Sequence, residues 1–169
     1  MGLFDFLKKK TEPAAPAQSG CVLLQPMDGK VIPLEEIGDG VFSSGVLGNG
    51  CGLIPSGEAV YAPVSGTVGT VAETKHAVGI ETADGAEILI HVGLETVSMN
   101  GEGFDVKVKE GDKVEAGQLL MTFSQAAIEA AEGVSTTSAF LVTNSDDFPG
   151  FRVLRTGEGK VGDELIRLK

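Results

Sequence analysis

The chain contains two histidines, His76 and His91, in neighbouring runs of alternating apolar residues. An Asp-Gly pair at residues 84–85 separates the runs, which predicts a β-hairpin with a two-residue turn. In that register Val78 lies opposite His91 and Gly93 opposite His76, so both rings occupy one face, roughly 7–8 Å apart at the backbone. We expect Gly93 to leave space beside the two rings.

A neutral imidazole can act as a nucleophile, a proton shuttle or a metal ligand. Phosphoryl transfer needs one unprotonated ring nitrogen, a hydrogen bond on the other nitrogen and nearby donors, and His91 with His76 and the Thr74 hydroxyl can supply this set. A catalytic zinc site normally has three protein ligands, and the sequence offers no third histidine. Zinc would need a ligand from an acidic side chain or a partner. The alternative is that both histidines are structural.

The composition argues against a nucleic-acid surface, since 24 acidic and 13 basic residues give a formal net charge of −11. Such a charge suits basic protein partners, although solubility alone would also explain it. Cys21 and Cys51 lack paired spacing and are predicted to be free thiols in a reducing compartment. With no secretory signal and no apolar run long enough to cross a bilayer, we expect a cytoplasmic protein.

The chain divides into three predicted parts. Residues 1–10 place apolar side chains before three lysines, a pattern typical of an amphipathic helix that contacts an anionic membrane peripherally. The alternative is an unstructured tail, because ten residues hardly form a helix alone in water. Residues 11–20 contain prolines and small residues and are predicted to be a flexible linker. Residues 21–169 are expected to form a single domain.

Within that domain the pattern predicts many short strands. Glycine accounts for 24 of 169 residues, dispersed between Val- and Ile-rich runs. A Pro-x-x-Gly-x-Val pattern at residue 26 recurs at residue 63, each copy predicting a turn that leads into a strand. Residues 125–132 are predicted to be a helix capped by Ser124 and ended by Gly133. Further strands are predicted around residues 110–120, 139–143 and 164–168. The expected fold class is all-β: an antiparallel β-sandwich or barrel-sandwich hybrid with one or two short helices.

Several stretches together resemble a known family, the enzyme IIA component of the bacterial glucose phosphotransferase system, which includes glucose, N-acetylglucosamine and β-glucoside modules. The resemblance implies a cytoplasmic phosphocarrier that accepts a phosphoryl group from the protein HPr and passes it to a cysteine on the IIB domain of a sugar permease. The stretches that carry it are Met1-Gly2-Leu3-Phe4-Asp5, Asp39-Gly40-Val41-Phe42, Ala62-Pro63-Val64-Ser65-Gly66-Thr67-Val68, Glu73-Thr74-Lys75-His76-Ala77, Ile90-His91-Val92-Gly93 and Gly101-Glu102-Gly103-Phe104.

Transferred by motif, the resemblance implies that His91 is phosphorylated at Nε2. His76 then stabilises the phosphoryl group, and the Thr74 hydroxyl holds His76. No cofactor is required. In the family, zinc is known to bridge the two histidines and a partner's carboxylate, so a zinc site at His76 and His91 is expected only with a partner ligand.

The resemblance also implies a docking surface. Asp39 and Glu95 match acidic positions that meet a basic residue of HPr, while an apolar collar is matched by Val41, Phe42 and Leu47. Two positions depart from the family pattern: Glu95 stands where aspartate is common, and Ala72 stands where the best-known member has phenylalanine. Unphosphorylated members bind regulatory targets in some bacteria, including permeases, glycerol kinase and adenylate cyclase.

Three alternatives have specific weaknesses. Residues 111–120 also resemble biotinyl and lipoyl carrier domains, but the lysine contexts of those carriers, Met-Lys-Met and Asp-Lys-Ala, do not occur. A zinc peptidase of related fold would need further ligands. A purely regulatory binding protein would need no paired histidines. The sequence leaves the sugar open, because closely similar modules serve several sugars.

Overall fold

The computed structural model describes residues 22–169, so the predicted amphipathic segment and linker lie outside the described residues. Strands account for most of the regular structure, and the helices are short. The strands are β2 (Val22–Leu24), β3 (Gly29–Pro33), β4 (Asn49–Pro55), β5 (Ala59–Tyr61), β6 (Gly66–Val71), β7 (Ala77–Glu81), β8 (Glu87–His91), β9 (Phe104–Val106), β10 (Lys113–Val114), β11 (Leu119–Phe123), β12 (Ser138–Val142), β13 (Arg152–Val153), β14 (Gly157–Gly159) and β15 (Glu164–Arg167). The helices are α3 (Gln125–Ala130) and the 3₁₀ turns η1 (Leu34–Ile37), η2 (Phe42–Ser44), η3 (Thr96–Met99) and η4 (Ser145–Asp147).

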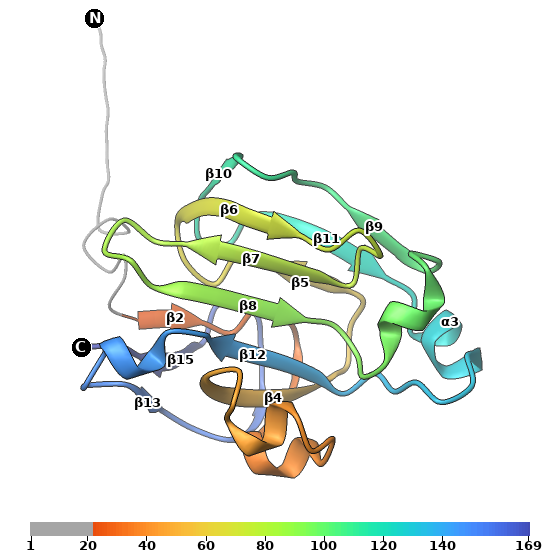
Figure 1. The fold of residues 1–169 in the computed structure, drawn as a ribbon, viewed down its shortest axis with the longest axis horizontal. Helices are drawn as coiled ribbons and strands as arrows, with labels where there is room; N and C mark the ends of the chain where they lie inside the picture. Colours follow the sequence, from red (N-terminus) through yellow and green to blue (C-terminus); the bar gives the residue numbers. More distant parts are fainter. Residues whose placement is uncertain (1–21) are drawn as a thin grey trace, which may run out of the picture.

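The strands form three antiparallel sheets (Figure 1). The largest has the order β10-β6-β7-β8-β12-β4-β3-β14, and two three-stranded sheets have the orders β5-β11-β9 and β13-β15-β2. The predicted all-β, antiparallel class is therefore confirmed, and the sheets are open within the described residues. In the large sheet β8 lies between β7 and β12, so its backbone is held from both sides.

The large sheet has two differently covered faces. Alternate side chains such as Val78, Ile80, Ile88 and Ile90 are buried in the main core, where each contributes roughly 1.5–3 kcal/mol. The opposite face, called here the outer face, carries a smaller cluster that packs under η1 and η2. Its buried members are Ile32, Leu34, Ile37, Phe42, Ala139 and Leu141. This second cluster ends beside β8, which is the strand that carries His91.

Most of the predicted elements are present. The Pro-x-x-Gly-x-Val copies lead into β3 and β6, and the strands predicted at residues 139–143 and 164–168 are β12 and β15. The predicted helix starts as expected, because the Ser124 hydroxyl accepts a 3.0 Å hydrogen bond from the Ala127 N–H. It ends two residues early, since Ala131 is already extended (φ −83°, ψ 136°).

The predicted register of the β7–β8 hairpin is wrong by one residue. The loop has three residues rather than two, and only Gly85 takes a positive φ, 94°. The reason is Thr82, whose hydroxyl accepts from the Ala86 N–H at 2.9 Å and donates to the Asp84 carboxylate. These bonds favour a turn followed by one left-handed glycine, a common three-residue loop. Consequently Ala77, not Val78, lies opposite His91.

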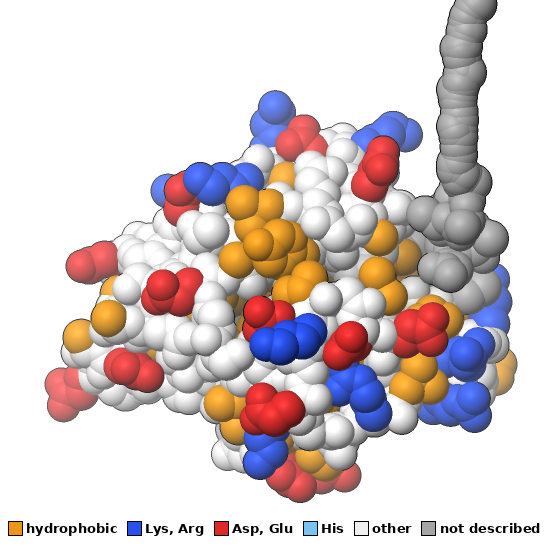
Figure 2. Space-filling model, turned by 180° about the vertical axis from the view of Figure 1, so that it is seen from behind, with side chains coloured by type: hydrophobic (Ala, Val, Ile, Leu, Met, Phe, Trp, Pro, Cys, Tyr) orange, Lys and Arg blue, Asp and Glu red, His pale blue; other side chains and the backbone are white. Residues whose placement is uncertain are grey.

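The surface charges, the lengths of the helices and the state of Cys51 can be compared with what the composition predicted. Figure 2 shows the side facing away from the viewer in Figure 1, where acidic and basic side chains are interspersed and no histidine is visible. Within residues 22–169 no helix is long and apolar enough to cross a membrane. Cys51 is a free, buried thiol, and burial raises its pKa to about 12, so it packs rather than reacts.

Candidate functional site

The two histidine rings are in contact. Their centroids lie 4.6 Å apart with an interplanar angle of 78°, an edge-to-face arrangement. The Phe42 ring also packs on His91, at a centroid distance of 4.8 Å. His91 therefore contacts both an aromatic ring and a second imidazole, and the predicted proximity of the histidines is confirmed.

Strand alternation alone does not explain this contact. The Val92 N–H donates to the His76 carbonyl at 2.8 Å, so in a regular ladder His76 and His91 would project from opposite faces. However, His76 precedes β7 and follows Lys75, which has a left-handed backbone with φ 66°. The irregular turn before β7 thus allows the His76 ring to reach His91. The prediction of a shared site was correct, but the diagonal-pair reasoning behind it was not.

A backbone carbonyl orients the His91 ring. Its Nδ1 lies 2.9 Å from the carbonyl oxygen of Gly93. Because a carbonyl can only accept, we assign the proton to Nδ1, which leaves the lone pair on Nε2. Gly93 does not open space beside the rings as expected: its φ is 80°, and an added Cβ would meet Thr96 Cγ2 at 2.4 Å. It supplies the carbonyl and fits a crowded backbone.

A hydroxyl orients the His76 ring. Thr74 Oγ1 lies 2.8 Å from His76 Nδ1, as the resemblance implied. This contact occupies one ring nitrogen and leaves Nε2 for a second partner. His76 is buried, with 7% of its surface exposed, whereas His91 is partly exposed.

Both histidines are neutral at pH 7. Burial is the main cause that lowers the pKa of His91 to about 4, and repulsion from His76 lowers it further. The Gly93 carbonyl and the Asp39 charge act in the opposite direction but are weaker. Burial also lowers the pKa of His76, partly offset by a hydrogen bond to the Thr74 backbone. A neutral His91 with a free Nε2 is the form that can act as a nucleophile.

A small hollow of about 160 Å³ opens beside His91. Two carboxylates, Asp39 and Glu95, line it together with Val41, Phe42, Leu94 and Val97. Asp39 accepts 3.0 Å hydrogen bonds from the Phe42 and Ser43 N–H groups at the start of η2. Partial burial alone would raise the pKa of Asp39, but these bonds outweigh it and hold the pKa below its ordinary value. The nucleophile is thus reached through an acidic, partly apolar mouth.

Comparison with protein families matches residues 21–148 to the phosphoenolpyruvate-dependent sugar phosphotransferase system, EIIA 1. The chain belongs to this EIIA family. It is therefore a component of a phosphotransferase system, and the family resemblance noted in the sequence is confirmed.

Individual relatives support this placement. The glucose-specific EIIA component of Halalkalibacterium halodurans is 42% identical over 99% of this chain and 96% of that protein. The β-glucoside-specific EIIBCA component of Dickeya chrysanthemi is 38% identical over 98% of this chain, which spans only 28% of that relative's length. Glucose permease IIA from Mycoplasma capricolum has a TM-score of 0.81 and 38% identity, covering 88% of this chain and 95% of that one.

Backbone strain borders the EIIA site. Only three described residues other than glycine have a positive φ, and two of them are Lys75, beside His76, and Glu95, in the wall of the hollow. Such conformations cost of order 1–3 kcal/mol and tend to occur at functional sites. Here Lys75 turns the backbone directly before His76, and Glu95 is the residue at which η3 begins.

The predicted docking residues differ in their exposure to solvent, and their contact with a partner stays a prediction. Phe42 is 8% exposed and packs on His91, so it supports the ring more than it presents a free surface. Leu47 is exposed but does not line the hollow around His91. Among the exposed apolar side chains, the sequence analysis named neither Val46, which is 75% exposed, nor Val97. Val46 and Leu47 lie between Gly45 and Gly48, and an apolar pair between two glycines was the available indication of an exposed apolar loop.

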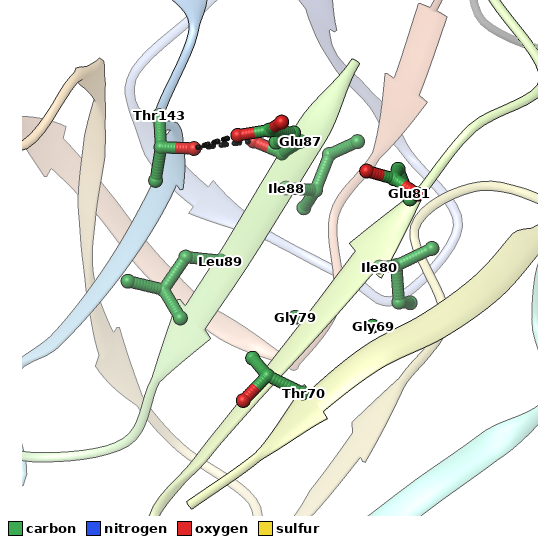
Figure 3. Close-up of a pocket in the computed structure, with 9 residues that line it drawn as sticks. All are labelled: Gly69, Thr70, Gly79, Ile80, Glu81, Glu87, Ile88, Leu89 and Thr143. Atoms are coloured by element: carbon green, nitrogen blue, oxygen red, sulfur yellow. Dashed lines mark hydrogen bonds between the residues drawn. The ribbon is translucent and has the colours of Figure 1, made fainter. Parts of the chain in front are cut away.

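A larger hollow of about 250 Å³ lies farther along the sheet (Figure 3). Gly69 and Gly79 line it, and so does Leu89, two residues before His91 on β8. Its carboxylates are Glu81 and Glu87, and the Thr143 hydroxyl bonds Glu87 (Figure 3). No histidine, cysteine or lysine lines it. Hence we assign the chemistry to the smaller hollow at His91.

The two histidines do not form a metal site by themselves. Residues 22–169 contain no cluster of three or more side chains of the kinds that hold metal ions. Two imidazoles fall short of the four ligands that tetrahedral zinc takes. The expectation of zinc completed by a partner's ligand stays a prediction, and no step of the chemistry below passes through a metal.

Proposed function

We propose that this EIIA chain is a histidine phosphocarrier in which His91 accepts a phosphoryl group from HPr. The observation that carries the proposal is the fixed ring: Nδ1 is bonded to the Gly93 carbonyl, so Nε2 presents a lone pair, and the ring is neutral at pH 7. The test is incubation with phosphoenolpyruvate, enzyme I and HPr. The chain should take up one acid-labile phosphate.

In the proposed step the Nε2 lone pair forms a bond to phosphorus while the bond between phosphorus and the HPr donor atom breaks. No proton moves at Nε2, because the neutral tautomer already carries its proton on Nδ1. The His91 ring becomes cationic at nitrogen, and the Gly93 carbonyl accepts a stronger, charge-assisted hydrogen bond from Nδ1. The Thr74 hydroxyl holds His76 at Nδ1, and His76 then donates its Nε2–H to the phosphoryl oxygens.

The proposed acceptor is the IIB domain of a glucose-type sugar permease. The support comes from relatives named as EIIBCA and EIICBA components, in which this chain matches 28% and 22% of the length. Glucose is the sugar named for the Halalkalibacterium relative, and β-glucosides for the Dickeya relative.

The acidic mouth should attract a basic donor. Replacing Asp39 with Asn and Glu95 with Gln should slow transfer from HPr by about tenfold at low salt and much less at high salt, because exposed charges mainly steer encounter. Asparagine can still cap η2, so the backbone there should persist. Stopped-flow or quench-flow transfer rates across ionic strengths are the measurement.

A matched control for that pair is Glu158→Gln with Glu164→Gln, two exposed glutamates on β14 and β15. This control removes the same charge away from the hollow and should leave the salt dependence close to that of the parent chain. Equal salt profiles for both double variants would place the docking surface elsewhere.

Residues 1–10 are proposed to hold the carrier at an anionic membrane. Their apolar side chains would enter the interface, while each of the three lysines adds about 1 kcal/mol near anionic lipid. The intact chain should sediment with anionic vesicles and not with neutral ones, and a chain lacking residues 1–10 should sediment with neither yet still accept phosphate. Absence of binding by the intact chain would rule out this anchor.

A regulatory role is a second proposal, and one observation favours it. Two exposed apolar side chains, Val41 and Val97, line the hollow at His91, and two more, Val46 and Leu47, lie in the loop after η2. Such a surface can bind a partner when no phosphoryl group is present on His91. Binding of a candidate target that is lost on phosphorylation would be the test.

A further inference from the structure

Two buried hydroxyls hold one peptide group beside His91. The Thr96 hydroxyl donates to the Val92 carbonyl at 2.6 Å, and the Gly93 N–H donates to the Ser138 hydroxyl at 3.0 Å. Both ends of the Val92–Gly93 peptide are therefore bonded by side chains. Thr96 and Ser138 are each 0% exposed. We call these two side chains the hydroxyl clamp.

The next peptide is fixed as well. The Leu94 N–H donates to the Ser135 carbonyl at 2.8 Å, which holds the Gly93–Leu94 peptide and so the Gly93 carbonyl. Gly93 itself has φ 80° and no room for a Cβ, because Ser135 O would lie 2.6 Å away. Consequently the carbonyl that binds His91 Nδ1 has its direction set on both sides of the glycine.

A buried hydroxyl at position 138 needs an explanation. The rest of β12, Ala139 to Val142, is apolar and fully buried. Burying a hydroxyl costs roughly 1–3 kcal/mol unless it is hydrogen-bonded. Ser138 meets this demand by accepting from Gly93 and donating to the Thr136 carbonyl at 2.9 Å. Its contact with Gly93 joins β12 to the turn that follows β8.

We propose that Ser138 and Thr96 are positioning residues for phosphoryl transfer, acting through the Gly93 carbonyl to keep His91 in its Nδ1–H tautomer. Neither side chain touches the reacting atoms. Without the clamp the Val92–Gly93 peptide can rotate, and the Gly93 carbonyl then loses its alignment with His91 Nδ1. A fraction of His91 would carry its proton on Nε2, and that nitrogen would have no lone pair to attack phosphorus. The kinetic part of this inference rests on the proposed function; the tautomer part does not.

The test compares variants with and without each hydroxyl. Ser138→Ala and Thr96→Val remove one hydroxyl each, whereas Thr96→Ser keeps the hydroxyl and loses only a methyl group. The ¹⁵N shifts of the His91 ring nitrogens report the tautomer. We expect one Nδ1–H tautomer in the parent chain and in Thr96→Ser, and a mixture in Ser138→Ala and Thr96→Val. Phosphoryl acceptance should fall about 10- to 100-fold in those two variants, by analogy with the loss of a group that orients a metal-binding histidine.

The control is Ser98→Ala, which removes an exposed hydroxyl that bonds the Glu95 carbonyl within η3. It should leave both readouts unchanged. An unchanged tautomer in folded Ser138→Ala and Thr96→Val would overturn the clamp, and so would equal losses in Thr96→Val and Thr96→Ser, which would indicate packing alone. If the parent chain accepts no phosphate, the proposed function fails, and the tautomer readout still decides the clamp.

Discussion

A His91→Ala chain should take up no phosphate from phosphoenolpyruvate, enzyme I and HPr, whereas the parent chain takes up one. The reason is that the Gly93 carbonyl holds the proton of His91 on Nδ1, which leaves Nε2 unprotonated. The His76 ring has the Thr74 hydroxyl at its Nδ1 instead. His76 remains in this variant, so the result also asks whether a second imidazole can substitute. Mass spectrometry and release of label in acid are the measurements.

The pH dependence gives an independent check. Because burial lowers the pKa of His91 to about 4, its Nε2 should stay unprotonated as the pH falls from 7 to 5, and only below about 4 should protonation remove the nucleophile. An ordinary surface histidine would already be mostly protonated at pH 5. NMR titration of the His91 ring reports this directly. Label on the His91→Ala chain, or a His91 pKa near 6.5, would contradict the assignment.

The fold class could be predicted because it depends on local signals. Alternating apolar residues, glycine turns and the Ser124 cap act within a few residues, and they gave the strands and the helix start correctly. The hairpin register failed because it depends on a side chain: Thr82 bonds Ala86 and Asp84 and adds one residue to the loop. An Asp-Gly pair alone does not contain that information.

The histidine pair could also be predicted, but its surroundings could not. Val46 and Val97 are exposed because no segment of the described chain covers them, and coverage is a property of the whole fold. Ser138 lies 45 residues from Gly93 in the sequence, so its hydrogen bond follows only once β12 pairs with β8. Contacts of this length leave no periodic trace in the sequence.

A His76→Gln chain should separate the two halves of the transfer. Acceptance from HPr should survive, because His91 keeps its Gly93 carbonyl and its Nε2 lone pair. Onward transfer to a IIB domain should fall by about 10²-fold or more, the usual scale for losing one positioned group at the reacting centre. The reason is distance: the centroids of the His76 and His91 rings lie 4.6 Å apart, so His76 is within reach of a phosphoryl group on His91 Nε2.

The two half-reactions can be measured separately, first by labelling from HPr and then by chasing the labelled chain with a purified IIB domain. Thr74→Val gives a graded companion, since it removes the hydroxyl 2.8 Å from His76 Nδ1 but leaves the ring in place. It should slow the chase less than His76→Gln does. Equal losses in both steps for His76→Gln would mean that the second ring only supports the packing of His91, and the division of roles between the histidines would have to be abandoned.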